Sequence, residues 1–594
     1  MKKIQKILIA NRTEIACRVI SACKALDIKS VAVYSEADQG LRHVRLADES
    51  ICIGKSDSHE SYLNIESLLF AAKKTNAQAV HPGYGFLSEQ ALFAEAVLKA
   101  GLVWIGPHPK TIEQMGNKVE AKKIADHLKI PTLPWVLLNE PWDVKILENA
   151  AKKIGFPLLL KAASGGGGRG MRLVEKLSDL HEKADSALRE AKSAFGKSHL
   201  FLEKYLPYAR HIEVQVLGDV HGNVIAVGER ECSIQRRHQK VIEECPAVDL
   251  SEKTCKKLWD ATLKLAKEVH YESAGTCEFL VDPKEDFYFL EMNTRIQVEH
   301  PVTEQVWGLD LVALQIQIAQ GHKLPSLIKD RKPQGHAIEV RLYAEDPENS
   351  FMPSCGKLEQ LSFPLLPFLR IETGYEQGNE ISPYYDSMIA KVVCWGLDRN
   401  QAIQKIIFAL LEIKILGVQT NLSYLKDVLS HPEFYSGKLS TRFLEEKFLN
   451  WKNPKQNLME LKKTSAWEFF GENNLGSQKN YKSLLLEDLQ PKRAQDRHAT
   501  EGNTNPTQYN EKQIDSDDGV ASPLQSTYPG KVIKVLVCPG QKVKKGQIAV
   551  LCESMKMELS YVAPADTTVK LVYVKEGQII TAKTLLVDWV LELK

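Results

Sequence analysis

Two glutamates on neighbouring predicted strands form a candidate metal site. Residues 276–293 alternate apolar and polar side chains on either side of the turn 283–286, which predicts a β-hairpin. The simplest register places Glu278 opposite Glu291, with Asn293 next along the same face. Two opposed carboxylates repel each other, and a divalent cation between them would reverse that effect. Hard oxygen ligands of this kind suit Mg²⁺ or Mn²⁺. The same register gives the pairs Asp282–Phe287 and Leu280–Phe289.

A polar segment directly follows this hairpin. Arg295, Gln297 and Glu299 stand at alternate positions, so the pattern predicts that they share one face of a strand. Such a face could hold a small anion and place a carboxylate beside it.

Glycines fill a loop between two predicted strands. Leu158–Lys161 and Met171–Val174 have strand patterns, and residues 164–170 lie between them. A loop between two strands predicts a hairpin flap rather than the loop-to-helix cradle of a P-loop, and no Gly-Lys-Ser/Thr sequence follows it. Its backbone N–H groups could close over phosphates, with positive charge from Lys118 and Lys161. The consecutive glycines are Gly165, Gly166, Gly167 and Gly168.

A lysine between two methionines lies near the end of the chain. Residues 548–551 and 559–562 predict two short strands, and a tight hairpin would place Met555 and Lys556 at its turn. Favoured two-residue turns need positive φ at both positions, so Asn, Asp or Gly is normal there. Met-Lys is poor turn chemistry, which indicates that something other than local stability selected Lys556.

These segments resemble biotin-dependent carboxylases. The Met-Lys-Met turn is similar to that of their biotinyl domain, in which the central lysine carries biotin through an amide bond. The resemblance therefore implies that Lys556 is the biotinylated residue and that a biotin protein ligase modifies it. From residue 1 to about 448 the chain resembles biotin carboxylase, whose nucleotide-binding part has the ATP-grasp fold. The segments that carry this similarity are residues 10–16, 81–89, 235–240 and 291–301.

The resemblance also implies a reaction. Glu299 would be the general base that deprotonates bicarbonate, so that bicarbonate attacks the γ-phosphate of ATP. The resulting carboxyphosphate releases CO₂ and phosphate, and the phosphate deprotonates N1′ of biotin. Arg341 would stabilise the biotin enolate, and Glu278 and Glu291 would bind the metal ion. Bicarbonate would be held by Lys240, Arg295, Gln297 and the backbone of Val298. ATP would be held by the hinge residues Glu203, Lys204, Tyr205 and Leu206 and by His211, Gln235 and His238.

Two positions depart from the family pattern. The family normally has glycine where this chain has Thr13 in the segment 10–16, so a positive φ there would strain the backbone. Ser554 replaces the alanine that most often precedes the Met-Lys-Met turn, which is a small change.

Five segments follow from these patterns. Residues 1–112 alternate strand and helix patterns, which predicts a parallel α/β (preATP-grasp) domain whose ligand edge carries residues 10–16 and 81–89. A polar stretch without large apolar clusters, within residues 449–522, predicts a largely flexible linker. The remaining segments are an ATP-grasp domain at 113–335, a biotin carboxylase C-terminal domain at 336–448 and an all-β biotinyl, lipoyl-like flattened barrel at 523–594.

Composition excludes several functional classes. The 594 residues include 77 basic and 75 acidic side chains, so a net charge of +2 argues against nucleic acid or an anionic membrane as a partner. The 11 cysteines contain no Cys-x-x-Cys pair, which favours reduced thiols over a disulfide or zinc framework. A strand pattern begins at Ile7 without an apolar leader, so we expect a soluble cytoplasmic protein.

The expected function is that of a fused biotin carboxylase and biotin carrier subunit. It would use MgATP and bicarbonate to form carboxybiotin on Lys556 and supply it to a separate carboxyltransferase β subunit, because residues 449–522 are too few for a carboxyltransferase domain. The layout resembles acyl-CoA carboxylase α chains, with acetyl-CoA or propionyl-CoA as the acceptor and a homodimeric carboxylase core. The alternatives are a split pyruvate carboxylase, a carrier or scaffold with an inactive ATP-grasp part, and another ATP-grasp ligase joined to a lipoyl-like domain.

Overall fold

The computed structural model describes residues 3–138, 144–162, 171–185, 187, 200–328, 331–454, 523–555 and 557–590. They form two units, one built mainly from the first 453 residues and one mainly from the C-terminal strands. In this part of the chain, no helix combines the length and the apolar character needed to cross a membrane.

A parallel sheet forms the N-terminal part, as the sequence predicts. Its strand order is β3-β2-β1-β4-β5, and every neighbouring pair is parallel. Ile7 and Ile9 pack into the core that contains Val19 of α1, whereas Leu8 packs into the core on the other face with Phe93 of α4. Strand β1 is therefore buried on both faces, as expected of a central parallel strand. The strands are β1 (Lys6–Ile9), β2 (Lys29–Ser35), β3 (Glu49–Gly54), β4 (Ala79–His81) and β5 (Val103–Trp104), and the helices are α1 (Thr13–Ala25), α2 (Arg42–Leu46), α3 (Ile65–Lys74) and α4 (Ala91–Lys99).

The strand order reverses between β1 and β4, and two of the sequence motifs meet at this point. Residues 10–16 follow β1, and residues 82–89 follow β4. Asn11 Nδ2 donates to the backbone oxygens of Pro82 and Tyr84, both at 2.7 Å. Open α/β sheets bind ligands at this kind of switch point.

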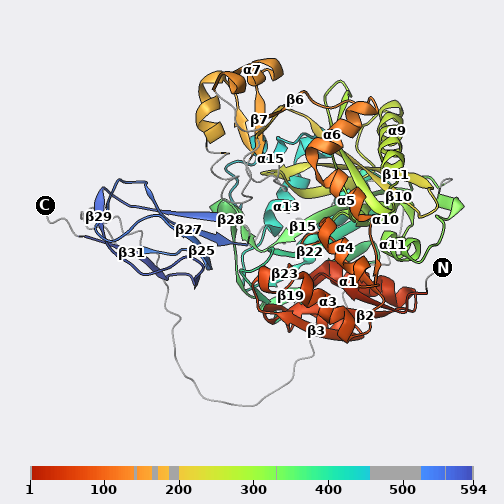
Figure 1. Ribbon diagram of the computed structural model, residues 1–594, viewed down its shortest axis with the longest axis horizontal. Coiled ribbons are helices and arrows are strands. Elements are labelled where there is room, and N and C mark those ends of the chain that lie inside the picture. The colour runs from red at the N-terminus through yellow and green to blue at the C-terminus, as the bar shows by residue number, and fades with distance from the viewer. Residues whose placement is uncertain are drawn as a thin grey trace, which may run out of the picture. The chain divides into compact units, whose positions relative to one another are not determined.

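The middle of the chain forms an eight-stranded antiparallel sheet, coloured from yellow through green to blue-green in Figure 1. Its order is β14-β13-β10-β11-β12-β15-β22-β20, so it is continuous across the boundary expected at residue 335. Buried residues of α9, such as Leu258 and Leu265, pack on Val214 of β10 and Phe279 of β13. The strands are β10 (Arg210–Gly218), β11 (Val224–Arg236), β12 (Gln239–Cys245), β13 (Ser273–Val281), β14 (Phe287–Asn293), β15 (His336–Tyr343), β20 (Leu369–Thr373) and β22 (Met388–Gly396).

Helices cover this sheet and connect it to its neighbours. Helix α9 begins where Ser251 accepts a hydrogen bond from the backbone N–H of Thr254, a standard N-cap. Ile403 and Ile406 of α12 pack into the same core as Val340 of β15. The helices of this part are α5 (Pro109–Gly116), α6 (Lys118–His127), α9 (Glu252–Glu268), α10 (His300–Trp307), α11 (Leu311–Ala319), α12 (Arg399–Glu412), α13 (Leu422–Leu429), α14 (Pro432–Tyr435) and α15 (Phe443–Lys447).

A smaller sheet carries the strands on either side of the glycine loop. Strands β7 and β8 pair antiparallel, which confirms the predicted hairpin, and the full order is β6-β9-β7-β8. Leu147 and Ala151 of α7 pack against Leu158 and Leu160 of β7. The elements are β6 (Trp135–Leu138), α7 (Val144–Ile154), β7 (Leu158–Ala162), β8 (Arg172–Val174) and β9 (Leu200–Lys204).

The C-terminal strands form two four-stranded sheets, in keeping with the predicted all-β domain. Their orders are β24-β31-β29-β26 and β28-β27-β25-β30. In β25, buried Val532 alternates with exposed Lys531 and Ile533, as in a strand with one face on a core. The strands are β24 (Leu524–Gln525), β25 (Gly530–Val535), β26 (Lys542–Val543), β27 (Ile548–Ser554), β28 (Met557–Val562), β29 (Thr567–Val572), β30 (Ile579–Ile580) and β31 (Leu585–Trp589).

Candidate active site

The predicted pair of opposed glutamates is present. Glu278 on β13 lies opposite Glu291 on β14, as the hairpin pattern predicts. The rest of the predicted register is wrong by one residue, and the turn spans 282–286. A bulge next to Glu278 absorbs the difference, because alternation gives the period of each strand but does not reveal an inserted residue. Nearer the turn the pairs are Val281–Phe287, Leu280–Tyr288 and Phe279–Phe289, in place of Asp282–Phe287 and Leu280–Phe289.

Lys240 on β12 joins three carboxylates. Its Nζ lies 2.5 Å from Glu213, 2.9 Å from Glu278 and 2.7 Å from Glu299. The Glu213 and Glu299 side chains are completely buried. Burial alone would lower the pKa of Lys240, but the three carboxylates raise it well above its ordinary value. We call these four residues the carboxylate cluster.

Residues 294–299 form a loop, so the prediction that their alternate side chains share a strand face is wrong. Strand β14 ends at Asn293, and Glu299 is the N-cap residue of α10. Side-chain hydrogen bonds hold the loop in place of a strand ladder. Arg295 donates to Gln297 at 2.8 Å and to Asn293 at 3.0 Å, and Gln297 donates to Glu278 at 2.9 Å.

Arg295 also connects the site to the N-terminal switch point. Its Nε donates to Glu89 Oε2 at 2.9 Å, and the Glu89 carboxylate accepts from the backbone N–H of Thr294. The backbone oxygen of Val298 accepts from Lys391 Nζ at 3.0 Å. The loop is thus anchored from two sides by charged residues of other segments.

Glu299 is an ionised carboxylate without solvent exposure. Its Oε1 pairs with Lys240, and its Oε2 accepts from Arg341 at 3.0 Å. Burial would raise the pKa of Glu299, but Lys240, Arg341 and Arg230 lower it well below its ordinary value. Arg341, on β15, also donates to Glu243 at 2.6 Å. The structure therefore brings the predicted base and the predicted enolate-stabilising arginine into direct contact.

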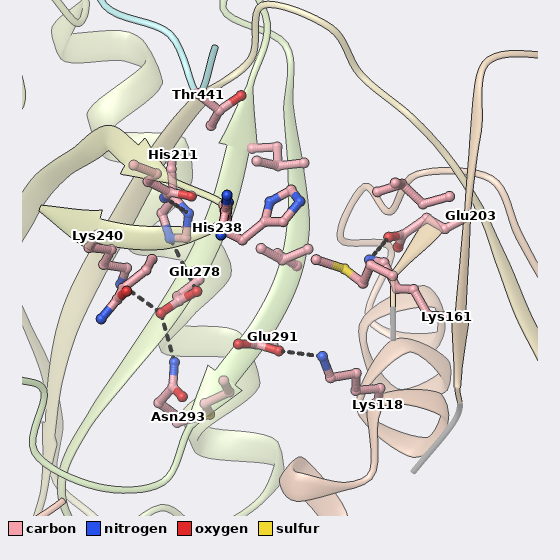
Figure 2. A pocket seen from close by; sticks show the side chains of 18 of the residues that line it. Lys118, Lys161, Glu203, His211, His238, Lys240, Glu278, Glu291, Asn293 and Thr441 are labelled. Atoms are coloured by element: carbon pink, nitrogen blue, oxygen red, sulfur yellow. Dashed lines mark hydrogen bonds and ion pairs between the residues drawn. The ribbon is translucent and has the colours of Figure 1, made fainter. Parts of the chain in front are cut away.

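A second set of charged residues lies at the other end of the same cavity, where the sequence predicts nucleotide binding and which we call the nucleotide end (Figure 2). Lys118, the first residue of α6, lies 3.1 Å from Glu291, and both side chains are about 30% exposed, at 28% and 31%. The pair raises the pKa of Lys118 above its ordinary value. Lys161 on β7 pairs with Glu203 on β9, as Figure 2 shows. The hinge continues from Lys204 into Tyr205 and Leu206, and all three line the cavity.

The predicted nucleotide-pocket residues of the large sheet lie together. Gln235 Nε2 donates to His211 Nδ1 on β10 at 2.9 Å, and His211 Nε2 lies 3.1 Å from Glu278. His238 stands in the turn between β11 and β12 with φ 64°. Burial, followed by the charge of Lys161, lowers the pKa of His238, which favours the neutral ring at pH 7.

One cavity of about 1420 Å³ connects these groups. It exceeds the usual size of a pocket for a single small ligand, so it has room for a nucleotide and a second substrate. Glu299 lies behind the wall and contacts it through Lys240 and Arg341. The predicted residues that line the cavity are Lys118, Lys161, Glu203, Lys204, Tyr205, Leu206, His211, Gln235, His238, Lys240, Glu278, Glu291, Asn293, Arg295, Gln297, Val298 and Arg341.

The donors at the predicted metal position fit a divalent cation. Glu278 and Glu291 both line the cavity, and their hard carboxylate oxygens are now balanced by Lys240 and Lys118. Asn293 donates to Glu278 at 2.8 Å, and its own oxygen accepts from Arg295. Glu291 is therefore available by exchange of Lys118 for a metal ion, with the Glu278 carboxylate of the cluster opposite it.

Two groups of predicted residues lie outside the described part of the chain. These are Lys556 and the consecutive glycines Gly165, Gly166, Gly167 and Gly168. The elements around them agree with the predictions: β7 and β8 flank the glycine loop, and β27 and β28 flank the Met-Lys turn. Met555 has φ 46°, the sign that a tight hairpin turn needs at its first position.

Thr13 has a positive φ, the conformation that would strain the backbone at this position according to the sequence analysis. Its φ is 50°, in the left-handed region that a β-branched residue rarely adopts. A Cβ at Gly374 would lie 2.3 Å from Thr13 Cα, so a glycine at 374 makes room for this turn. Glu14, the next residue, lies 3.2 Å from Lys391, which holds Val298.

Sequence reasoning missed several residues that touch the predicted ones. Glu213 follows His211 by two positions on β10, so strand alternation places both on one face. Lys122 follows Lys118 by four positions on α6, which places both on one face of the helix. Glu89 lies in the segment 81–89, which resembles the family, but the sequence analysis gave this residue no role. Glu243 gave no local signal, because its partner Arg341 is distant in sequence.

Four family models match the chain in the order of these parts. The model "Biotin carboxylase, N-terminal domain" matches residues 3–112, and "Carbamoyl-phosphate synthase L chain, ATP binding domain" matches residues 117–327. The models "Biotin carboxylase C-terminal domain" and "Biotin-requiring enzyme" match residues 339–446 and 520–588.

A relative of similar length decides the family. The methylcrotonoyl-CoA carboxylase subunit α of Dictyostelium discoideum is 40% identical over 96% of this chain and 93% of its own length. The chain belongs to the biotin-dependent carboxylase α subunits. The human propionyl-CoA carboxylase α chain is 46% identical and the mouse methylcrotonoyl-CoA carboxylase subunit α is 47% identical, each over 75% of this chain. Those alignments cover 61% and 62% of the relatives, so the chain spans about three fifths of their length.

Solved structures agree with this assignment. The Campylobacter jejuni biotin carboxylase in an ATP complex is 46% identical with a TM-score of 0.72, over 75% of this chain and 99% of its own. The biotin carboxylase domain of Hydrogenobacter thermophilus 2-oxoglutarate carboxylase, with MgADP and bicarbonate, is 44% identical with a TM-score of 0.72, over 75% of this chain and 98% of its own. The predicted fold class, the ATP-grasp biotin carboxylase activity, and biotin and ATP as cofactors are therefore confirmed at the level of the family. Several relatives are mitochondrial by name, so the cytoplasmic location stays a prediction.

Proposed function

We propose that the cavity uses ATP and bicarbonate to carboxylate biotin. The observation that carries this proposal is Glu299, a carboxylate that Lys240 and Arg341 keep ionised next to the cavity that Arg295, Gln297 and Val298 line. A general base must be deprotonated before it acts, and these two cations hold Glu299 in that form.

The donors around Glu299 have separate tasks in this proposal. Arg295, Gln297, Lys240 and the backbone of Val298 bind bicarbonate and orient it toward the nucleotide. Glu299 takes the bicarbonate proton as the oxygen of bicarbonate attacks the γ-phosphate, and ADP leaves. Because these groups are held by many hydrogen bonds before substrate binds, little reorganisation is needed during the reaction.

Residues at the other end of the cavity bind ATP. Lys118, Lys161 and the loop of Gly165, Gly166, Gly167 and Gly168 hold the phosphates, and the hinge of Glu203, Lys204, Tyr205 and Leu206 holds the adenine with His211, Gln235 and His238. Glu278 and Glu291, with Asn293, hold Mg²⁺ or Mn²⁺. When bound, the metal ion neutralises charge on the phosphate oxygens.

Biotin is carried on Lys556 in this proposal, where a biotin protein ligase attaches it. Its ring supplies the nitrogen that accepts the carboxyl group. Arg341 lies on the wall of the cavity and presents a fixed cation to that ring. The carboxylase part acts as a homodimer.

The partner is a carboxyltransferase β subunit with an acyl-CoA acceptor. The names of the relatives support methylcrotonoyl-CoA or propionyl-CoA, and acetyl-CoA, which the sequence also suggested, is not among the relatives reported above. A 2-oxo acid acceptor is the second candidate, because the similar solved structures include Rhizobium etli pyruvate carboxylase at 41% identity and a TM-score of 0.72, over 77% of this chain and 41% of its own. Capture on monomeric avidin followed by mass spectrometry of the co-eluting subunit separates the two. A crotonase-like partner supports acyl-CoA, and a TIM-barrel partner supports a 2-oxo acid.

Glu299→Gln tests the proposal as a whole. The variant removes the base but keeps the shape of the side chain, so bicarbonate-dependent ATP cleavage with free biotin should fall by about 10²–10⁴-fold. Glu268→Gln, at an exposed position at the end of α9, is the matched control and should leave the rate unchanged. A Glu299→Gln protein that folds and retains wild-type cleavage would overturn the proposal.

A further inference from the structure

Glu203 is shared by two buried lysines, only one of which reaches the cavity. Lys122 Nζ lies 2.6 Å from Glu203 Oε1, and Lys161 Nζ pairs with Glu203 Oε2. The Lys122 and Glu203 side chains are 3% and 2% exposed. Lys161 and Glu203 line the cavity, and Lys122 lies behind them. Lys122 is thus placed to act through Glu203 rather than on a ligand.

Lys122 comes from a different element than its partners. Lys161 and Glu203 lie diagonally on neighbouring strands of the small sheet, since Lys161 pairs with Phe201 and Glu203 with Leu159. Lys122 lies on α6, one turn after Lys118. Two lysines in the first turns of a helix oppose the helix dipole, so helix stability does not explain their presence.

The second lysine changes what happens when Lys161 moves. Burial alone would raise the pKa of Glu203, but Lys161 and Lys122 lower it to about 2, so the carboxylate is ionised. A buried carboxylate left without a cation is strongly unfavourable. If Lys161 turned from Glu203 to a phosphate, Glu203 would still keep the ion pair with Lys122.

We propose that Lys122 is a positioning residue for nucleotide binding, which keeps Glu203 paired while Lys161 leaves it to bind the phosphates of the nucleotide. This rests on the proposed use of ATP. Without Lys122, Lys161 is the remaining ion-pair partner of Glu203 among the described residues. A phosphate contact by Lys161 would then leave the buried Glu203 carboxylate without a cation. The loss therefore affects nucleotides that carry phosphates and spares adenosine, which has none.

Binding of MgADP and of adenosine to the full-length chain by titration calorimetry tests this inference. Lys122→Met is expected to weaken MgADP binding about tenfold and to change adenosine binding less than twofold. Lys122→Arg keeps the cation and restores MgADP affinity to within about threefold of wild type. Lys110→Met, at an exposed position of α5, is the control for loss of one surface lysine.

The double variant Lys122→Met/Glu203→Gln shows whether the effect passes through Glu203. In a Glu203→Gln background there is no charge to strand, so the further loss of Lys122 should change MgADP binding less than twofold. An equal tenfold loss in both backgrounds, or equal losses for MgADP and adenosine, would overturn the inference. If wild type binds neither ligand, the proposed function itself fails; if wild type and Lys122→Met bind MgADP equally, only this inference fails.

Discussion

The two ends of the cavity hold their charges in different ways. In the carboxylate cluster, one ammonium group serves three carboxylates, and two of these have no exposed surface. At the other end, beside the buried group of Lys122, Lys161 and Glu203, Lys118 and Glu291 form a one-to-one pair in which each side chain is about 30% exposed, at 28% and 31%. The carboxylate cluster is buried and each of its members has more than one partner, whereas the Lys118–Glu291 pair is partly exposed and has one partner on each side.

This difference matches the tasks that we propose for the two ends. A base that takes a proton from a small anion must be placed before the substrate arrives, since reorganisation during the reaction slows it. A pair that binds phosphates and a metal ion must exchange partners when they arrive. Partly exposed pairs exchange at little cost, because their free energy is small in water. The cavity thus combines a fixed end and an exchangeable end.

Removal of Lys240 gives the largest expected effect. Lys240→Met leaves Glu213, Glu278 and Glu299 without their shared cation, and breaking a buried ion pair costs about 3–5 kcal/mol. The free energy of unfolding, measured by denaturant titration with intrinsic fluorescence as the signal, should fall by that amount. The rate of ATP cleavage should fall more than 100-fold. Lys257→Met on the exposed side of α9 is the control. Equal denaturation midpoints for Lys240→Met and wild type would show that the carboxylate cluster does not stabilise the protein, and so is not a fixed part of the cavity.

Glu14 contacts Lys391, which holds the loop beside the carboxylate cluster, and its titration predicts that the free energy of unfolding depends on pH. Burial raises the pKa of Glu14 to about 7, although Lys391 opposes this. Because the folded state holds the proton more tightly than the unfolded state, this group stabilises the protein below pH about 4.5 and loses that contribution as the pH rises to about 7. Glu14→Gln keeps a neutral side chain, so its stability relative to wild type should rise by about 3 kcal/mol between pH 4.5 and 7.5.

Thermal unfolding midpoints of both proteins across that pH range measure the difference. Glu372, Lys391 and Arg341 also act on Glu14, so the difference between wild type and variant reports the titration of Glu14 together with its effect on these neighbours. A constant offset between the two curves, like that expected for the Glu268→Gln control, would show that Glu14 does not titrate in this range.

Much of this site follows from the sequence because short-range patterns decide it. The Glu278–Glu291 pair followed from alternation on a hairpin, and the strands around the glycine loop followed from their apolar runs. The bulge beside Glu278 and the loop at 294–299 did not, because both depend on hydrogen bonds that alternation does not encode. The loop is held by Glu89, more than 200 residues away.

The strained turn at Thr13 illustrates the same limit. The resemblance to the family marked the position, but Gly374, which accommodates it, follows strand β20 some 360 residues later. Other contacts of charged side chains are also long-range, such as Arg341 with Glu243 and Lys391 with the backbone oxygen of Val298. Lys122 is different, since its spacing from Lys118 was visible on the helix and only its partner Glu203 was not.

The exchangeable end gives the smallest effect on stability. Lys118→Met removes a partly exposed pair, so the free energy of unfolding should change by less than about 1 kcal/mol, against 3–5 kcal/mol for Lys240→Met. The KM for ATP should nevertheless rise at least about tenfold, because one charge-assisted contact to a phosphate is lost. Steady-state ATP cleavage and denaturant titration on the same preparation measure both quantities. If Lys118→Met destabilised the protein as much as Lys240→Met, the nucleotide end would be as fixed as the carboxylate cluster, and the distinction between the two ends would fail.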